Sequence, residues 1–122
     1  MEMDARLQEA RDGDAQVWDV LLAHGMVAGR ALEIESVFVA DDEAVVGALT
    51  AALAGTGATT AAEPFTERAG LFRRVTRWSV LATVTLPAAD LAAVQALSEQ
   101  MLRAGDTAGA GYDGWSASVP EA

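Results

Sequence analysis

The chain has 122 residues, a length typical of one domain built around one hydrophobic core, so we expect a single domain over residues 1–122. Its 18 acidic residues outnumber its 8 basic residues. The formal charge of −10 repels phosphate backbones and anionic membranes, which argues against direct binding to nucleic acids or lipid surfaces. The absence of cysteine excludes a disulfide framework, a thiolate nucleophile and a zinc–sulfur site.

The N-terminal residues do not resemble a secretory signal, because Met1 to Asp4 is acidic where a signal would be basic and then apolar. No apolar run approaches the ~20 residues that a membrane-spanning helix needs. Together with the lack of cysteine, these features favour a reducing compartment, and we expect the protein in the cytoplasm.

The first predicted element is an amphipathic helix over residues 4–24. Apolar residues recur at three- and four-residue steps from Leu7 to Leu22, the period of a helix with one buried face. Gly25 is placed to end it. The apolar face of this helix must be covered either by an end or edge of a sheet or by another subunit.

Residues 31–40 predict a strand with one solvated face. Leu32 and Phe38 lie on the apolar side, and Glu33 and Glu35 alternate with it on the other side. The two glutamates form an acidic patch, which is either a solvated strand face or a contact for a basic partner.

A second helix is predicted after this strand. Asp41 and Asp42 are candidate N-caps, and Glu43 suits the first helical turn. The helix should end near Gly55 or Gly57. Three adjacent acids do not converge their oxygens as a calcium-binding loop does, so we interpret them as a cap rather than a metal site.

Two further strands are expected over residues 58–64 and 77–86, where β-branched and apolar residues alternate. The segment between them, residues 65–76, is either a long loop or an extension of both strands into a protruding hairpin around Gly70.

Residues 65–77 hold half of the positive charge of the chain, beside the apolar pair Leu71 and Phe72. Arginine and aromatic residues are favoured at the cores of interfaces, which indicates a docking element. The alternative is a solvated hairpin balanced by Glu63 and Glu67. The arginines are Arg68, Arg73, Arg74 and Arg77.

Pro87 ends the preceding strand and fits near the start of a third helix, whose buried stripe runs from Leu91 to Leu102. Residues 106–111 predict a glycine-rich turn, and the final strand is expected over residues 112–119.

Without the first helix, the order over residues 31–119 is strand, helix, strand, strand, helix, strand. This is the βαββαβ pattern of ferredoxin-like folds. We therefore predict an α+β, ferredoxin-like domain, in which an antiparallel sheet carries two helices on one face and the N-terminal helix is an addition.

No enzyme signature is visible in the sequence. His24 is the only histidine, and near a helix C-terminus it complements the helix dipole. No cysteine or second histidine exists to build a metal or nucleophile site around it, and no serine lies in a nucleophile elbow. We expect a non-enzymatic protein without a metal or cofactor.

Residues 111–115 read Gly-Tyr-Asp-Gly-Trp and follow a helix that ends in a short glycine turn. This segment resembles the closing strand of the regulator of ribonuclease activity B family, and the order and length of the other elements agree with it. The resemblance implies a small acidic ferredoxin-like protein that binds ribonuclease E and inhibits its endonuclease activity through protein–protein contact.

In a regular strand, Tyr112 and Trp115 project to opposite faces, so Tyr112 joins Glu33 and Glu35 on the open face if Trp115 enters the core. A bulge within the motif would change that assignment. An alternative function is sensing of a small molecule, because ferredoxin-like domains pair sheets or edges to make ligand sites. The candidate partner-binding residues are Glu33, Glu35, Phe72, Arg73, Arg74, Arg77 and Tyr112, and the structural residues of the motif are Asp113, Gly114 and Trp115.

Overall fold

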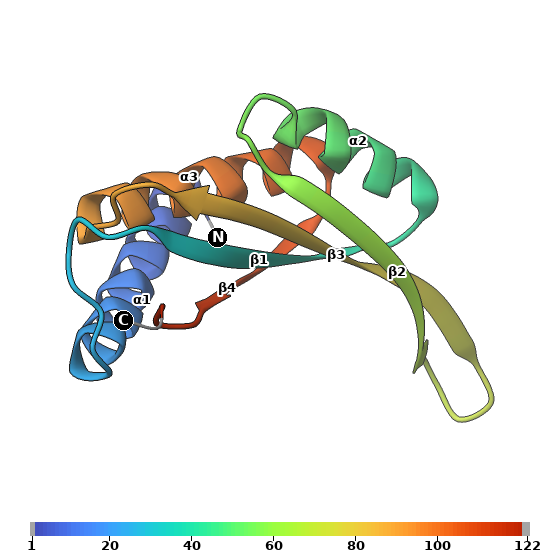
Figure 1. Ribbon diagram of the computed structural model, residues 1–122. Coiled ribbons are helices and arrows are strands. Elements are labelled where there is room, and N and C mark those ends of the chain that lie inside the picture. The colour runs from blue at the N-terminus through green and yellow to red at the C-terminus, as the bar shows by residue number, and fades with distance from the viewer. Residues whose placement is uncertain (1, 121–122) are drawn as a thin grey trace.

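The computed structural model describes residues 2–120, which form three helices and four strands (Figure 1). The elements are α1 (Met3–Ala23), β1 (Leu32–Ala40), α2 (Glu43–Leu53), β2 (Thr59–Arg68), β3 (Arg74–Leu86), α3 (Leu91–Ala108) and β4 (Gly111–Ala117). The strands pair into an antiparallel sheet in the order β2-β3-β1-β4. The predicted α+β class with an antiparallel sheet is confirmed.

Helices α2 and α3 lie on one side of the sheet and leave its other side uncovered (Figure 1). The side chains of β1 follow this arrangement, because alternate residues from Leu32 to Ala40 are buried while Glu33 and Glu35 between them are exposed. A strand that is covered on one face has this period of two. The hydrophobic core therefore lies between the sheet and the helices.

Helix α1 packs along α3 and beside the edge strand β4 (Figure 1). Its Trp18 and Leu21 side chains are buried in the same core as residues of β1 and α3. Most of the apolar face of α1 is thus covered within the chain, at an edge of the sheet, which was one of the two predicted positions, whereas Leu22 stays 42% exposed. Across residues 2–120, no helix is both long enough and apolar enough to span a membrane.

Aspartate side chains cap the N-termini of α2 and α3. Asp42 Oδ1 accepts a hydrogen bond from the Val45 backbone N–H at 2.9 Å, and α2 starts there as predicted. Asp90 Oδ1 accepts from the Ala93 N–H at 2.7 Å in the same way at the start of α3. These caps satisfy backbone donors that have no partner within the helix.

Helix α3 is longer than the sequence predicts, because it continues through Gly105 to Ala108 before ending at Gly109. A Cβ on Gly105 would lie 3.3 Å from the Phe38 ring and 3.1 Å from the Ala110 carbonyl oxygen. This glycine therefore serves a close approach of α3 to β1.

Strands β2 and β3 extend beyond residues 58–64 and 77–86 and form the protruding hairpin, so the loop alternative does not apply (Figure 1). Arg68 pairs with Arg74, and the turn is closed by a hydrogen bond of 2.9 Å from the Ala69 N–H to the Arg73 carbonyl oxygen. The hairpin projects away from α1 and β4.

Candidate functional site

The turn of the β2–β3 hairpin exposes two large apolar side chains, since Leu71 is 75% exposed and Phe72 is 96% exposed. Arg68, Arg73 and Arg74 around them are also exposed, and none of the three forms an ion pair with a residue between positions 2 and 120. We call these five residues the hairpin tip. The tip is a basic and apolar patch on a chain of formal charge −10.

Arg77 lies further along β3, and its charge is balanced by neighbouring acids. Its Nε is 3.0 Å from Glu67 Oε1 and 3.6 Å from Asp41 Oδ1. Exposed ion pairs of this kind contribute about 0–1 kcal/mol to stability, but they neutralise the local field. Arg77 therefore differs from the arginines of the hairpin tip, whose charge no acid in the described part of the chain compensates through an ion pair.

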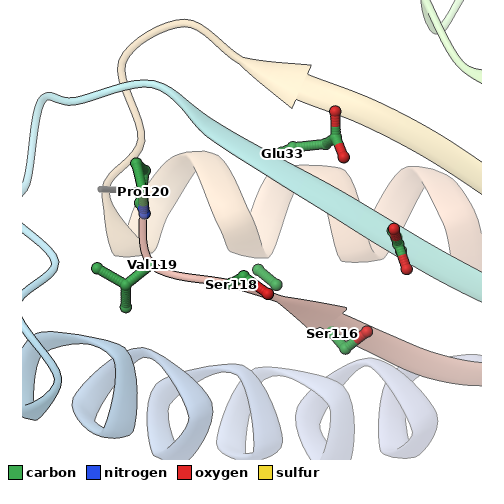
Figure 2. Close-up of a pocket in the computed structure, with 7 residues that line it drawn as sticks. Glu33, Ser116, Ser118, Val119 and Pro120 are labelled. Atoms are coloured by element: carbon green, nitrogen blue, oxygen red, sulfur yellow. The ribbon is translucent and has the colours of Figure 1, made fainter. Parts of the chain in front are cut away.

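Glu33 and Glu35 lie on the open side of the sheet, at the end remote from the hairpin tip. Glu33 pairs with Thr85 near the end of β3, whereas the tip lies around the turn that leads into β3 and reaches only its first residue, Arg74. A cavity of about 360 Å³ adjoins both glutamates, and Figure 2 shows Glu33 on one side of it and Ser116, Ser118, Val119 and Pro120 on the other. Its two carboxylates suit a basic group, but the structure does not bring them together with the hairpin tip.

The closing strand contains a bulge that turns Tyr112 toward the helices. Ser36 of β1 pairs with Trp115 and Phe38 pairs with Tyr112, so residues 113–114 oppose one residue of β1. Both aromatic side chains therefore project to the helix-covered face, where the Tyr112 ring centroid lies 5.2 Å from that of Phe38. A regular strand would have placed Tyr112 on the open face with Glu33 and Glu35, and the bulge prevents this.

Gly114 makes this bulge possible, because its φ of 94° lies in a region that side chains disfavour. We expect Gly114→Ala to lower the free energy of unfolding by about 1–2 kcal/mol through backbone strain alone, since no atom lies within 4 Å of its Cβ position. Gly111→Ala in the same strand is the control, with an expected change within about 0.5 kcal/mol. Urea denaturation measures both, and equal effects would contradict the assignment of strain to the bulge.

A buried polar cluster, which the sequence did not reveal, joins α1, α3 and β4. Asp14 is only 3% exposed, and its Oδ1 accepts hydrogen bonds from Ser98 Oγ at 2.9 Å and from Trp115 Nε1 at 2.7 Å. These bonds tie the N-terminal helix to the third helix and to the closing strand. The bond from Trp115 Nε1 also fixes the orientation of the Trp115 indole.

Two atoms of this cluster are buried without a hydrogen-bond partner among the described residues, namely Asp14 Oδ2 and the Tyr112 hydroxyl. Burial raises the pKa of Asp14, although the hydrogen bonds from Trp115 and Ser98 oppose that rise. Burial also raises the pKa of Tyr112 to about 12, and nearby Ser98 and Ser36 temper this shift without bonding to the hydroxyl in good geometry. Tyr112 is thus neutral at physiological pH.

One sequence signal could have identified Asp14. It stands in the apolar stripe of α1, between Ala10 and Val17, at a position where a charged residue enters the core. A carboxylate there requires hydrogen-bond donors from another element. Which donors those are depends on the neighbours of α1, which the sequence pattern does not indicate.

His24 and the acidic residues before α2, which the sequence offered as candidates, have structural roles. His24 caps the end of α1, exposed, with Nδ1 2.8 Å from the Val20 carbonyl oxygen. Asp42 is used as the N-cap of α2. Within residues 2–120, no three carboxylate, imidazole or thiolate side chains gather as a metal ion would require.

Comparison with known proteins adds no assignment. No protein-family model matches this chain, and no curated protein sequence matches it significantly.

Proposed function

We propose that this chain is a non-enzymatic, cytoplasmic regulatory protein that binds a partner protein through its hairpin tip, and that the partner is ribonuclease E, whose endonuclease activity it inhibits. The observation that carries the proposal is the 96% exposure of Phe72 among three arginines that form no ion pair with any residue from 2 to 120. The resemblance of residues 111–115 to the closing strand of the ribonuclease regulators supplies the identity of the partner. We also propose the ferredoxin-like class, which the strand order β2-β3-β1-β4 supports.

The hairpin tip has the composition of an interface anchor. Burying a phenylalanine side chain is worth about 1.5–3 kcal/mol, and that free energy is not gained while Phe72 stays in water. Hot spots of interfaces combine an aromatic anchor with arginine, as Phe72 is combined with Arg73 and Arg74. The partner surface that fits is an apolar pocket with an acidic rim.

A protein surface is favoured over RNA as the partner. Single-stranded nucleic acids are bound along a continuous basic groove with several aromatic platforms, whereas this tip offers one aromatic ring on a strongly acidic chain. An acidic protein surface can contact the basic hairpin tip locally. Salt screens charges over about 8–10 Å, which removes most of the repulsion between that surface and the acidic remainder of this chain.

The acidic cavity beside Glu33 and Glu35 is a second proposed contact, for a basic segment of the same partner. Arg77 contributes less than the tip, since Glu67 and Asp41 already compensate its charge. Tyr112 is not part of the proposed contact surface, because its ring packs on Phe38 in the core and not on the open face.

The double variant Phe72→Ser with Arg73→Ser tests the proposal. It is expected to weaken binding to purified ribonuclease E by about 2–4 kcal/mol, roughly 30- to 1000-fold, because it removes an aromatic anchor and a charged contact. Surface plasmon resonance measures the affinity, and an RNA-cleavage assay measures the inhibition. The melting temperature should be unchanged, because both side chains are exposed.

Val27→Ser with Arg103→Ser is the matched control, since it also removes one exposed apolar and one exposed basic side chain, at sites away from the hairpin. This control should bind and inhibit like the wild type. The proposal fails if the wild-type protein neither binds nor inhibits ribonuclease E, or if the hairpin variant behaves like the control.

A further inference from the structure

The open face of the sheet, which α2 and α3 leave uncovered, carries apolar side chains at its centre. Val37 of β1 pairs with Leu81 of β3, which also pairs with Ala61 of β2, so these three side chains project to the same side. Val39 and Phe65 lie on this side by the same alternation. These five residues are not part of the hydrophobic core, and each is at least partly exposed. The centre of the open face is therefore an apolar surface that no helix of residues 2–120 covers (Figure 1).

The two ends of the open face carry opposite charges. Glu33 and Glu35 lie at one end, beside the cavity of about 360 Å³ (Figure 2), and the arginines of the hairpin tip lie at the other end. Neither these glutamates nor these arginines form an ion pair between positions 2 and 120. The hairpin bends away from α2 and α3 (Figure 1), so its tip stands on the side of the open face. An unpaired acidic end and an unpaired basic end thus flank the apolar centre.

The two charged ends are equally far from the middle of the open face. Ser79 of β3 lies five residues after Arg74, the first residue of the strand. Glu33 and Glu35 pair with residues that lie six and four positions after Ser79. At about 3.3 Å per residue, each end is roughly 16 Å from Ser79. A two-fold axis at Ser79, in the plane between two stacked sheets, therefore places the basic end of one copy over the acidic end of the other.

We propose that this chain forms a two-fold homodimer, in which two open faces stack and the hairpin tip of each copy enters the acidic cavity of the other. The tip arginines then meet Glu33 and Glu35, and Phe72, which is 96% exposed in the single chain, leaves water. Leu81 of one copy faces the row of Phe65 in the other. A second copy is the favoured occupant because it supplies an apolar centre and both opposite charges at the matching separation.

The size of the open face indicates a weak dimer. With strands about 4.8 Å apart and about 3.3 Å per residue, ten residues of β1, β3 and β2 cover a plane of roughly 500 Å². A stable interface buries about 800 Å² on each partner, so the stacked faces alone are too small. The tip and the acidic cavity supply the remaining contact. We expect a Kd on the order of 10 µM, in the range of small transient interfaces.

Repulsion between two acidic chains does not outweigh these local contacts. Each copy has a formal charge of −10, but salt screens exposed charges beyond about 8–10 Å. Glu63 pairs with Ser79 in the middle row, and it is exposed on the edge strand β2, where water screens its charge from that of the second copy. The opposite charges at the two ends are in direct contact and are screened much less.

Sedimentation equilibrium of the full chain without any partner tests the dimer. The monomer has a mass of 12.6 kDa, and the average mass should rise toward twice this value as the concentration increases. With the expected affinity, the rise should occur between about 1 and 500 µM. A mass that stays at that of the monomer would overturn the proposal. Species larger than a dimer would also overturn it, because a two-fold contact closes on two copies.

Two charge-reversal variants test the orientation of the copies. Glu33→Arg with Glu35→Arg makes both ends basic, and Arg73→Glu with Arg74→Glu makes the tip acidic beside an acidic cavity. Each variant alone should dimerise about 100-fold more weakly, because like charges then meet at both contacts. A 1:1 mixture should form a heterodimer with the affinity of the wild type, since opposite charges meet again at both contacts. Absence of the heterodimer would contradict the tip-to-cavity contact.

Glu9→Arg with Asp19→Arg is the matched control, because it makes the same change of net charge at exposed sites of α1. This control should dimerise like the wild type, and a loss equal to that of the Glu33 and Glu35 variant would contradict the assigned contact. All the exchanged side chains are exposed, so circular dichroism should show the wild-type fold. The dimer needs no ribonuclease E, so its absence would leave the proposed function standing. A tip held by a second copy is not free for another protein.

Discussion

Replacing Phe38 by alanine is expected to lower the free energy of unfolding by about 3–5 kcal/mol. Phe38 is fully buried on β1, contacts the Tyr112 ring, and fills the space that Gly105 leaves open in α3. Because three elements meet on this ring, the cavity left by alanine cannot be closed by the movement of one side chain. For a domain with a total stability of about 5–15 kcal/mol, this is a large fraction.

Phe72→Ala is the matched control for this prediction, because it makes the same chemical change at a ring that is 96% exposed. Its free energy of unfolding should stay within about 0.5 kcal/mol of the wild type. Urea denaturation followed by circular dichroism measures both variants. A loss below about 1.5 kcal/mol for Phe38→Ala would mean that the core is not packed around this residue.

Asp14→Ala is expected to lower the free energy of unfolding by about 2–3 kcal/mol at neutral pH. The reason is that Trp115 Nε1 and Ser98 Oγ would lose their acceptor in a buried site, and an unsatisfied buried donor costs about 1–3 kcal/mol. The removal of a buried charge offsets part of this loss. Asp14→Asn keeps the acceptor and should be clearly more stable than Asp14→Ala, and equal losses for both would contradict the hydrogen-bond geometry.

The Asp14 cluster also predicts an unusual dependence of stability on pH. Burial raises the pKa of Asp14 in the folded protein above its ordinary value of 3.8, so the folded state binds this proton more tightly than the unfolded state. The contribution of Asp14 to stability is therefore fully present below about pH 3.8 and is lost as the pH rises through the folded pKa. Tyr112, with a pKa of about 12, does not titrate in this window.

Ion-paired carboxylates elsewhere in the chain have the opposite effect, so the comparison with Asp14→Asn isolates the buried group. As the pH is lowered from neutral to about 4, the wild type should gain stability relative to Asp14→Asn. Denaturation of both proteins across this range measures the difference, and parallel curves would show that Asp14 does not keep a raised pKa in the fold.

The sequence alone determined the features that depend on neighbours along the chain. The alternation of Glu33 and Glu35 with apolar residues specified β1 and its solvent-exposed face. Successive side chains of a strand point to opposite faces of the sheet, whichever strands it pairs with. Asp42 was identifiable as a helix cap for a similar reason, since its hydrogen bond reaches only to Val45. The α+β class followed from the order of such elements.

The candidate surface was predictable in part. The clustering of Arg73 and Arg74 with Phe72 indicated a docking element from composition alone. Whether this segment was a loop or a hairpin depended on pairing between β2 and β3, which local propensity leaves undecided. The exposure of this segment and the ion pair between Arg77 and Glu67 could be recognised only from the register of β2 and β3.

Only the tertiary structure decided the closing strand and the polar cluster. Tyr112 faces the helices because Gly114 adopts a positive φ within a bulge, and one inserted residue reverses the facing of the side chains that precede it. Asp14 lies 84 residues from Ser98 and 101 residues from Trp115, so no local pattern links them. Packing of α1 against α3 and β4 brings these groups together, because a buried carboxylate is stable only where distant elements supply its donors.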